Sequence, residues 1–202
     1  MELIVLSNPE TIANEAKIIN QLFEAGMTRF HLRKPDWSGN QCMNLLKDLD
    51  PAFHPDVALH QHHYLTNDLN TKRLHFTENH RFNTSKETLI NQKLSGFLSS
   101  TSVHQLAEIH SLNAFDYVFF SPVFHSISKP GYQSKLEQGF VLKKVNSLQK
   151  MIALGGIDEH NLNQIRQMKF DGAAVLGAIW KNPEQAVTIF KQLNDLTKSY
   201  KE

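Results

Sequence analysis

The sequence has few of the features that mark secreted, membrane-spanning or nucleic-acid-binding chains. Its 202 residues include one cysteine, so no disulfide can form within the chain, and we expect a reducing, cytoplasmic environment. No apolar run approaches the roughly 20 residues needed to cross a bilayer. The formal net charge is +1, which predicts no surface potential for binding nucleic acid or an anionic membrane.

The first ten residues, MELIVLSNPE, lack the basic residues and the small-residue cleavage site of a signal peptide, so we interpret them as a first strand. We find no internal repeat, linker or low-complexity segment. The hydrophobic and charged contents, 41% and 20%, are those of an ordinary soluble protein. We therefore expect one domain spanning residues 1–202. Cys42 lies in a segment with helical spacing, where a buried small hydrophobe is expected rather than a catalytic thiol.

Short apolar runs alternate with segments of helical periodicity along the whole chain. Ser7-Asn8-Pro9 predicts a helix start, Gly26 the end of that helix, and Ser38 with Gln41 a capping box for a second helix. Thr84 or Ser85 is expected to cap a later helix, and further helices are predicted over residues 103–112, 159–168 and 183–200. The expected strands cover residues 3–6, 28–32, 57–59, 73–76, 94–98, 116–120, 151–154 and 172–176.

Eight strands alternating with helices in about 200 residues predict a (β/α)8 barrel. Between the third and fourth strands there is room for only a turn or two of helix. A doubly wound open sheet is the competing architecture. It would normally carry a glycine-rich turn after the first strand, where this chain has Ser-Asn-Pro.

In such barrels the site is built at the carboxyl ends of the strands, and phosphate often binds near the last two. Gly155 and Gly156 follow the seventh predicted strand, and Leu176 and Gly177 end the eighth. Backbone amides freed of side chains at these points could meet one phosphate. The alternative is that the glycines only relieve tight strand-to-helix turns.

Basic and hydroxyl side chains at two other strand ends suggest a second anion site. Arg33 directly follows the second predicted strand, and its guanidinium suits phosphate or carboxylate. Ser126, Ser128 and Lys129 lie in a long polar loop after the sixth strand and could together bind a diphosphate. The alternatives are a surface arginine and a solvated loop.

Histidines are frequent after two neighbouring strands. His60, His62 and His63 follow the third predicted strand, and His75 and His80 end or follow the fourth. Converging imidazoles could ligate a transition metal or transfer protons, whereas unconnected surface histidines are the alternative. No HExxH motif or familiar zinc spacing occurs. We expect His60 and His75 to project toward the barrel mouth and, if they are functional, to approach a metal, an anion or each other.

Five segments, in order along nearly the whole chain, resemble motifs of the thiamine phosphate synthase and TenI superfamily. DYVFFSPVFHSISK is similar to its strand-six motif DYVxxGPVFxTxTK, and MIALGGIDEHN to its VxAIGGI segment. DGAAVLGAI is similar to GVAVxSAI, TSVHQLAEI to GxSxHxxEEA, and FHLRKP to xQLREK. The resemblance implies the same (β/α)8 barrel.

The synthases of this superfamily join a pyrimidine methyl diphosphate to a thiazole phosphate and release pyrophosphate through a carbocation-like transition state. For this chain the resemblance implies diphosphate contacts from Arg33, Ser126, Ser128 and Lys129. It also places Ser102 at the strand-five serine, His31 at the strand-two glutamine, and Gly156 and Gly177 at backbone contacts to the thiazole phosphate.

The chain departs from the superfamily pattern at several site positions. The second basic residue of strand two falls on Pro35, with Lys34 one position earlier. The strand-three Asn-Asp pair falls on His60-Gln61, and the aspartate of the strand-four motif falls on His80. Those two aspartates hold Mg²⁺ in the synthases. Mg²⁺ is thus implied by resemblance alone, and Glu78, His75 and His80 are the weak metal candidates here.

The TenI-type members are thiazole tautomerases, which shuttle a proton with a histidine at the position of Pro122; His125 lies three residues later. Our first interpretation is a synthase-like enzyme in which Arg33 and Lys129 stabilise the departing diphosphate. The alternatives are a tautomerase with His125 or His60 as base, and a catalytically silent protein that senses a thiamine precursor. The expected partner is a phosphorylated small molecule, and a homo-oligomer is left open.

Overall fold

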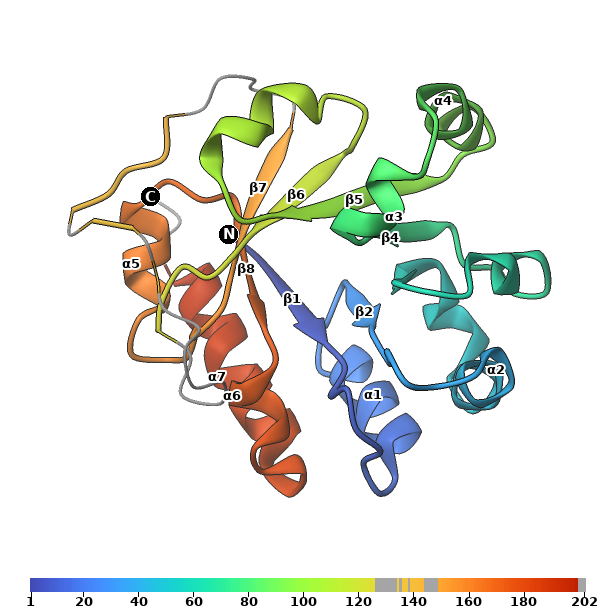
Figure 1. The fold of residues 1–202 in the computed structure, drawn as a ribbon. Coiled ribbons are helices and arrows are strands. Elements are labelled where there is room, and N and C mark those ends of the chain that lie inside the picture. The colour runs from blue at the N-terminus through green and yellow to red at the C-terminus, as the bar shows by residue number, and fades with distance from the viewer. Residues whose placement is uncertain (126–133, 135, 138, 144–148, 200–202) are drawn as a thin grey trace.

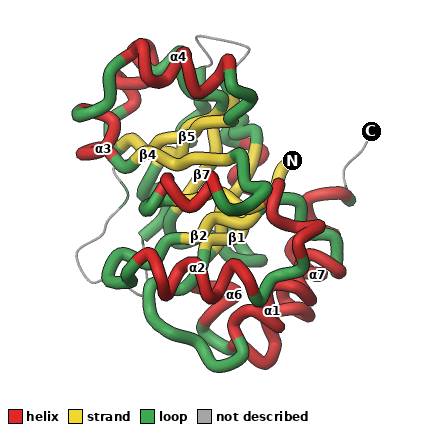
Figure 2. The backbone as a smooth tube through the Cα atoms, turned by 90° about the vertical axis from the view of Figure 1, so that its right-hand side faces the viewer, coloured by secondary structure: helices red, strands yellow, loops and turns green. Residues whose placement is uncertain are grey.

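Eight short parallel strands pair in chain order, and the last pairs with the first to close a barrel (Figures 1 and 2). The computed structural model describes residues 1–125, 134, 136–137, 139–143 and 149–199. The strands are β1 (Glu2–Leu6), β2 (Phe30–Leu32), β3 (Val57–Leu59), β4 (Arg73–Phe76), β5 (Leu98–Val103), β6 (Tyr117–Phe120), β7 (Lys150–Leu154) and β8 (Gly172–Val175). The predicted (β/α)8 barrel is therefore confirmed.

Helices surround the strands, as the tube view shows (Figure 2). They are α1 (Glu15–Glu24), α2 (Gly39–Lys47), α3 (Glu78–Phe82), α4 (Lys86–Leu94), α5 (Leu162–Gln167), α6 (Gly177–Trp180) and α7 (Ala186–Lys198). Single 3-10 turns add η1 (Pro51–Asp56), η2 (His63–Asn67), η3 (Leu106–Ser111) and η4 (Pro183–Gln185). The predicted capping box at Ser38 is present, Gly26 has a positive φ of 98°, and Cys42 is buried.

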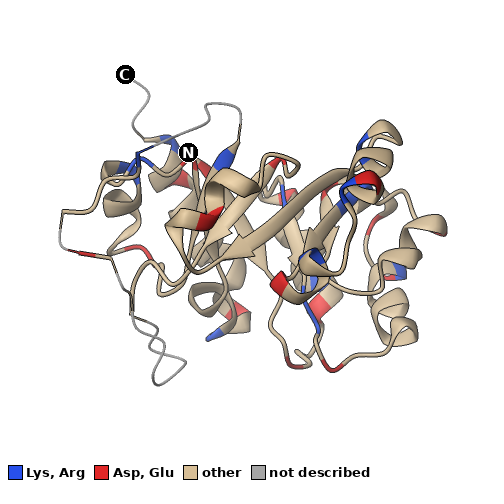
Figure 3. Ribbon diagram, turned by 45° about the horizontal axis from the view of Figure 1, so that its top comes forward, with Lys and Arg blue, Asp and Glu red and all other residues tan. Residues whose placement is uncertain are grey.

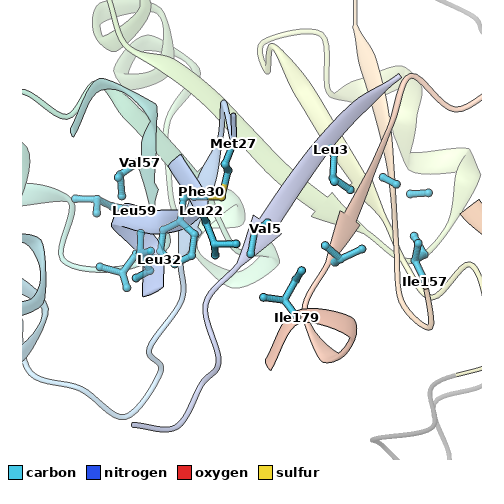
Figure 4. Packing of buried hydrophobic residues seen from close by; sticks show 14 of the residues in the cluster. Leu3, Val5, Leu22, Met27, Phe30, Leu32, Val57, Leu59, Ile157 and Ile179 are labelled. Carbon is cyan, nitrogen blue, oxygen red and sulfur yellow. The ribbon is translucent and has the colours of Figure 1, made fainter. Parts of the chain in front are cut away.

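Alternation along the strands divides the buried residues into two layers. The outward-facing layer packs under the helices and includes Leu3, Val5, Phe30, Leu32, Val57 and Leu59 (Figure 4). A smaller set faces the barrel interior: Ile4, Leu6, Tyr117, Phe119, Ile152 and Ala174. The register places these inner residues level with one another, since Leu6 pairs with His31, His75 with Ser100 and Phe119 with Ile152.

The predicted starts of two elements, the first helix and the fifth strand, are wrong. The first helix begins at Glu15 rather than near Ser7, because the Ser7 hydroxyl bonds the backbone of Arg33 instead of capping a helix. The fifth strand begins at Leu98 rather than residue 94. Leu94 is 81% exposed at the end of α4, and Gly96, with a φ of 82°, makes the turn between them.

The strand β5 is unusual in its polar composition. β5 is rich in serine and threonine, yet Ser100 and Thr101 are fully buried. The Thr101 hydroxyl donates to the Phe76 carbonyl, so the side chain satisfies its hydrogen bond within the sheet. The helix predicted over residues 103–112 is likewise shorter, because β5 runs to Val103 and only the 3-10 turn η3 follows.

Basic and acidic residues are interspersed over the molecule, as the charge-coloured ribbon shows (Figure 3). This distribution agrees with the net charge of +1. None of the helices formed by the described residues has the length and apolar character needed to cross a bilayer.

Candidate functional site

Three buried imidazoles meet inside the barrel near the carboxyl ends of neighbouring strands. His31 lies in β2, His60 directly follows β3, and His75 lies in β4. Their exposed fractions are 0%, 6% and 2%. Because these strands are adjacent in the barrel, inward-facing residues at similar heights must come close together.

The three rings are in direct contact. His31 Nδ1 lies 2.9 Å from His60 Nε2, and the His60 and His75 rings stack with centroids 3.9 Å apart. One ring nitrogen from each histidine lies within 4.8 Å of the other two. The expected approach of His60 and His75 is thus observed, and His31 joins them. We call His31, His60 and His75 the histidine cluster.

Hydroxyl groups hold the ring nitrogens that face away from the centre of the histidine cluster. His31 Nε2 lies 2.8 Å from the Tyr117 hydroxyl. His75 Nδ1 lies 2.9 Å from Ser100 Oγ, and its Nε2 lies 3.2 Å from Ser102 Oγ. These partners fix the orientation of two of the three rings.

Burial keeps the histidine cluster neutral at pH 7. Desolvation lowers the pKa of His31 and His60 well below the usual value, and the neighbouring imidazoles add to the effect. It lowers the pKa of His75 to about 3, with further contributions from the His63 and Arg33 charges. Desolvation also raises the pKa of Tyr117, which therefore remains a phenol. The cluster can consequently donate and accept hydrogen bonds or coordinate a cation, but it carries no charge of its own.

Arg33 brings a positive charge to the same end of the barrel. It directly follows β2 and is half-buried, and its charge lowers the pKa of both His60 and His75. The Ser7 hydroxyl fixes its backbone, accepting from the Arg33 amide at 2.8 Å and donating to the Arg33 carbonyl at 2.9 Å. Sequence reasoning missed Ser7, Ser100 and Tyr117, because their roles depend on the barrel register.

The glycines after β7 and β8 differ in their surroundings. Gly155 and Gly156 have φ values of 103° and 65°. A Cβ on Gly156 would lie 2.5 Å from the His125 carbonyl oxygen, so the chain after β6 packs directly against this turn. By contrast, a Cβ on Gly177 would meet nothing within 4 Å. The two turns end neighbouring strands at the same barrel end, because Leu154 pairs with Ala174.

Other predicted site residues are dispersed. His125 is exposed, and its Nδ1 accepts from the Ser134 amide at 3.3 Å. Its backbone lies beside Gly156, on the β6–β7 side of the barrel, away from β3 and His60. Leu176 is half-buried and packs against the inner apolar residues. Ser126, Ser128 and Lys129 lie outside the described residues.

The residues at the expected magnesium position do not fit that ion. The Gln61 amide donates to the Lys34 carbonyl, while Glu78 and His80 are exposed on α3 and do not join His75 in the barrel interior. Lys34 is also occupied, because its ammonium bonds Glu15 Oε2 at 2.6 Å in a buried ion pair. Mg²⁺ prefers oxygen ligands, and the described groups that converge here are imidazoles.

Comparisons of the sequence with known proteins agree over nearly the whole chain. A family model described as thiamine monophosphate synthase matches residues 3–179. A thiamine-phosphate synthase from Lysinibacillus sphaericus is 25% identical and one from Staphylococcus haemolyticus 27% identical. The first alignment covers 88% of this chain and 87% of the relative, and the second covers 87% and 86%.

Solved structures give the same result. A thiamine phosphate pyrophosphorylase from Bacteroides thetaiotaomicron superposes with a TM-score of 0.75 at 26% identity, covering 100% of both chains. A thiamine phosphate pyrophosphorylase from Pyrococcus furiosus superposes with a TM-score of 0.73 at 13% identity, covering 98% of this chain and 96% of the other. The second likeness supports the fold alone.

Proposed function

Because the chain belongs to the thiamine monophosphate synthase family, we propose that it joins a pyrimidine methyl diphosphate to a thiazole phosphate and releases pyrophosphate. The observation that carries this proposal is Arg33, a basic residue fixed by Ser7 at the carboxyl end of the barrel. The resemblance of FHLRKP to the family's strand-two motif supports a role for Arg33 in binding the diphosphate. The reaction is proposed to occur in the cytoplasm, on small phosphorylated metabolites.

The diphosphate is proposed to bind beside β2. A guanidinium can donate two parallel hydrogen bonds to phosphate oxygens, and fixing its backbone lowers the entropy lost on binding. The motif that follows β6 supplies Ser126, Ser128 and Lys129 as further contacts by resemblance. Because the reaction breaks a carbon–oxygen bond, positive charge here stabilises the negative charge that develops on the leaving group.

The thiazole phosphate is proposed to bind across the ends of β7 and β8. Gly156 and Gly177 follow adjacent strands at one end, where barrels of this kind commonly bind phosphate. The free space around Gly177 leaves its backbone accessible to an anion. The two substrates would then lie side by side over the barrel mouth, Arg33 next to one and the glycine turns next to the other.

The proposed reaction forms one bond and breaks another. The bond between the pyrimidine methylene carbon and the diphosphate oxygen breaks, and pyrophosphate leaves with the electron pair. The thiazole nitrogen then supplies its lone pair to the electron-deficient methylene carbon. The chain's tasks are to orient the nitrogen toward that carbon, to exclude water and to stabilise the leaving pyrophosphate.

A turnover assay with both precursors tests this function. We expect equal amounts of thiamine phosphate and pyrophosphate, and a fall of at least about tenfold in kcat/KM for Arg33→Gln, since a charge-assisted hydrogen bond contributes about 1.5–3 kcal/mol. Lys47→Gln, on the exposed surface of α2, is the matched control and should keep the wild-type rate. The assay is run with and without Mg²⁺, because use of that ion is a prediction from the family alone.

A TenI-type tautomerase is the second candidate, favoured by the position of His125. The His125 backbone packs against the Gly156 turn, where the thiazole phosphate is proposed to bind, and its imidazole is exposed. Exchange of solvent deuterium into the thiazole, without pyrophosphate release, would favour this reaction over the synthase. Binding of either precursor without turnover or exchange would favour the third reading, a sensor of a thiamine precursor.

A further inference from the structure

We propose that the histidine cluster binds one Zn²⁺ ion in the barrel interior. The ligands would be His31 Nδ1, His60 Nε2 and one ring nitrogen of His75. This site differs in its ligands from the carboxylate site for Mg²⁺ that the family resemblance implied, because it uses three imidazoles, and it does not depend on the reaction proposed above. Metal binding can therefore be measured whether or not the chain turns over either precursor.

The spacing of the ring nitrogens is close to that of a zinc site. With zinc–nitrogen bonds of about 2.0–2.1 Å, a tetrahedral site separates its ligand atoms by about 3.4 Å. Here the nitrogens of His31 and His60 are 2.9 Å apart, and all three fall within 4.8 Å. The stacked rings of His60 and His75, 22° from parallel, would have to rotate so that their nitrogens turn toward one ion.

The second ring nitrogens of His31 and His75 have outer partners of the kind that metal-binding histidines use. When His31 binds through Nδ1, its Nε2 carries the proton and donates to the Tyr117 hydroxyl. Whichever nitrogen of His75 binds, the other faces a serine, because Ser100 and Ser102 lie on the two sides of that ring. Such outer partners fix the tautomer and orientation of metal ligands.

The chemistry of the ligand set selects the metal. Three imidazoles without a carboxylate suit Zn²⁺ and disfavour Mg²⁺. Three protein ligands also leave a fourth coordination position, as in zinc sites that bind water or substrate.

The charge of Arg33 provides a second test, because its removal should change the binding of zinc and of diphosphate in opposite directions. Arg29 and Arg73, at the other end of the barrel, are paired with Glu2 at 2.8 Å and Asp56 at 3.1 Å. Arg33 acts on His60 and His75 from the mouth and would repel a cation there. Removing its charge should therefore strengthen zinc binding, whereas it should weaken the binding of diphosphate.

The family pattern suggests substitutions at two of the proposed ligands that should disturb the fold little. By resemblance, the family has glutamine at the position of His31 and asparagine at that of His60. His31→Gln and His60→Asn therefore introduce side chains that this barrel architecture accommodates, and both retain hydrogen-bonding groups. His110→Gln is the matched control, because His110 is exposed on η3 outside the barrel.

The experiment uses the whole chain, stripped of metal with a chelator and titrated calorimetrically with Zn²⁺ alone and Mg²⁺ alone. We expect one Zn²⁺ per chain, no Mg²⁺ binding, and tetrahedral visible absorption bands when Co²⁺ replaces Zn²⁺. His31→Gln and His60→Asn should each weaken Zn²⁺ binding by more than about 100-fold, beyond the effect of losing an outer partner. His110→Gln should bind like wild type, and Arg33→Gln about threefold or more tightly.

Circular dichroism of each variant shows that it is folded, and either ligand variant suffices if the other does not fold. Failure of the folded wild-type protein to bind Zn²⁺ and Co²⁺ overturns the proposal at once. So does binding that survives unchanged in a folded His31→Gln or His60→Asn protein, since the ion would then lie elsewhere.

Discussion

The two halves of the barrel interior are built from opposite chemistry. On the side of β1 and β6–β8 the inner residues are Ile4, Leu6, Tyr117, Phe119, Ile152 and Ala174, and the Tyr117 hydroxyl beside His31 is the one polar group among these side chains. On the side of β2–β5 they are His31, His60, His75, Ser100 and Ser102. Apolar burial stabilises the first half directly, whereas the second depends on hydrogen bonds that satisfy each buried polar group. A core that keeps such groups despite their desolvation cost is where chemistry is expected.

The barrel mouth continues this division. The ends of β7 and β8 present backbone at glycines, while the end of β2 presents a guanidinium fixed by Ser7. A rigid backbone recognises the shape and oxygens of one phosphate, and a charged side chain responds to negative charge that increases during reaction. In the proposed reaction, the glycine turns would hold the thiazole phosphate and the guanidinium would stabilise the leaving group.

The largest expected effect is acid destabilisation originating in the polar half. Desolvation lowers the pKa of His75 to about 3 and that of His63 to about 4. Histidines with normal pKa values in the unfolded chain bind protons there first, so the free energy of unfolding should fall as pH drops from about 6.5 toward 4. Each lowered pKa unit corresponds to about 1.4 kcal/mol, so the total loss is several kcal/mol.

Urea denaturation of the metal-free protein at pH 7, 6 and 5 measures this loss. His63→Gln should reduce the slope, whereas His160→Gln, which removes an exposed imidazole on the far side of the barrel, should not. Equal stability at pH 7 and 5 would mean that the interior imidazoles are solvated.

The next largest effect is expected for Phe119→Ala, which removes the ring between the two halves. Phe119 packs within the inner apolar residues and lies edge-on to His31, with centroids 4.9 Å apart. Its loss should lower the free energy of unfolding by about 3–5 kcal/mol. Phe82→Ala, which truncates a 74% exposed ring, should change it by less than about 0.5 kcal/mol. Similar losses for both would contradict this division of the interior.

A smaller effect separates the two glycine turns. Gly156→Ala should cost about 1–3 kcal/mol, because its φ is positive and the added methyl would collide with the His125 carbonyl. Gly177→Ala places the same methyl in open space and should leave stability unchanged or raise it by up to about 1 kcal/mol. Thermal unfolding of the two proteins side by side decides the point, and equal destabilisation would refute it.

The smallest effect concerns Lys129, predicted from the sequence motif to contact the diphosphate. Lys129→Ala should weaken pyrophosphate binding about tenfold, the equivalent of one charge-assisted hydrogen bond. Lys47→Ala is the calorimetric control. Unchanged affinity in Lys129→Ala would contradict this contact. Arg33 would then be the main cationic contact of the diphosphate.

Local signals predicted most of the barrel but not the composition of its interior. Residues 57–59 and 73–76 form strands with the predicted bounds because their flanking turns are clear in the sequence. Convergence of His60 and His75 followed from neighbouring strand ends. The roles of Tyr117 and Ser100 could not be predicted, because only the barrel's register determines which side of each strand faces inward. The bounds of β5 could not be predicted either, because a strand rich in serine and threonine does not look apolar in the sequence.

The two tryptophans of the chain lie one beside each half, which gives the protein two intrinsic fluorophores. Trp180 is buried in α6 and its indole Nε1 donates to the Leu6 carbonyl at 2.6 Å. Trp37 is half-buried, with the Lys34 ammonium 4.5 Å from its ring. Their different polarity should separate their emission maxima, the indole in the drier site emitting at shorter wavelength. The Trp37→Phe protein, which keeps Trp180, would therefore report the opening of the β8 side, and the Trp180→Phe protein, which keeps Trp37, that of the β2 side, without an attached label.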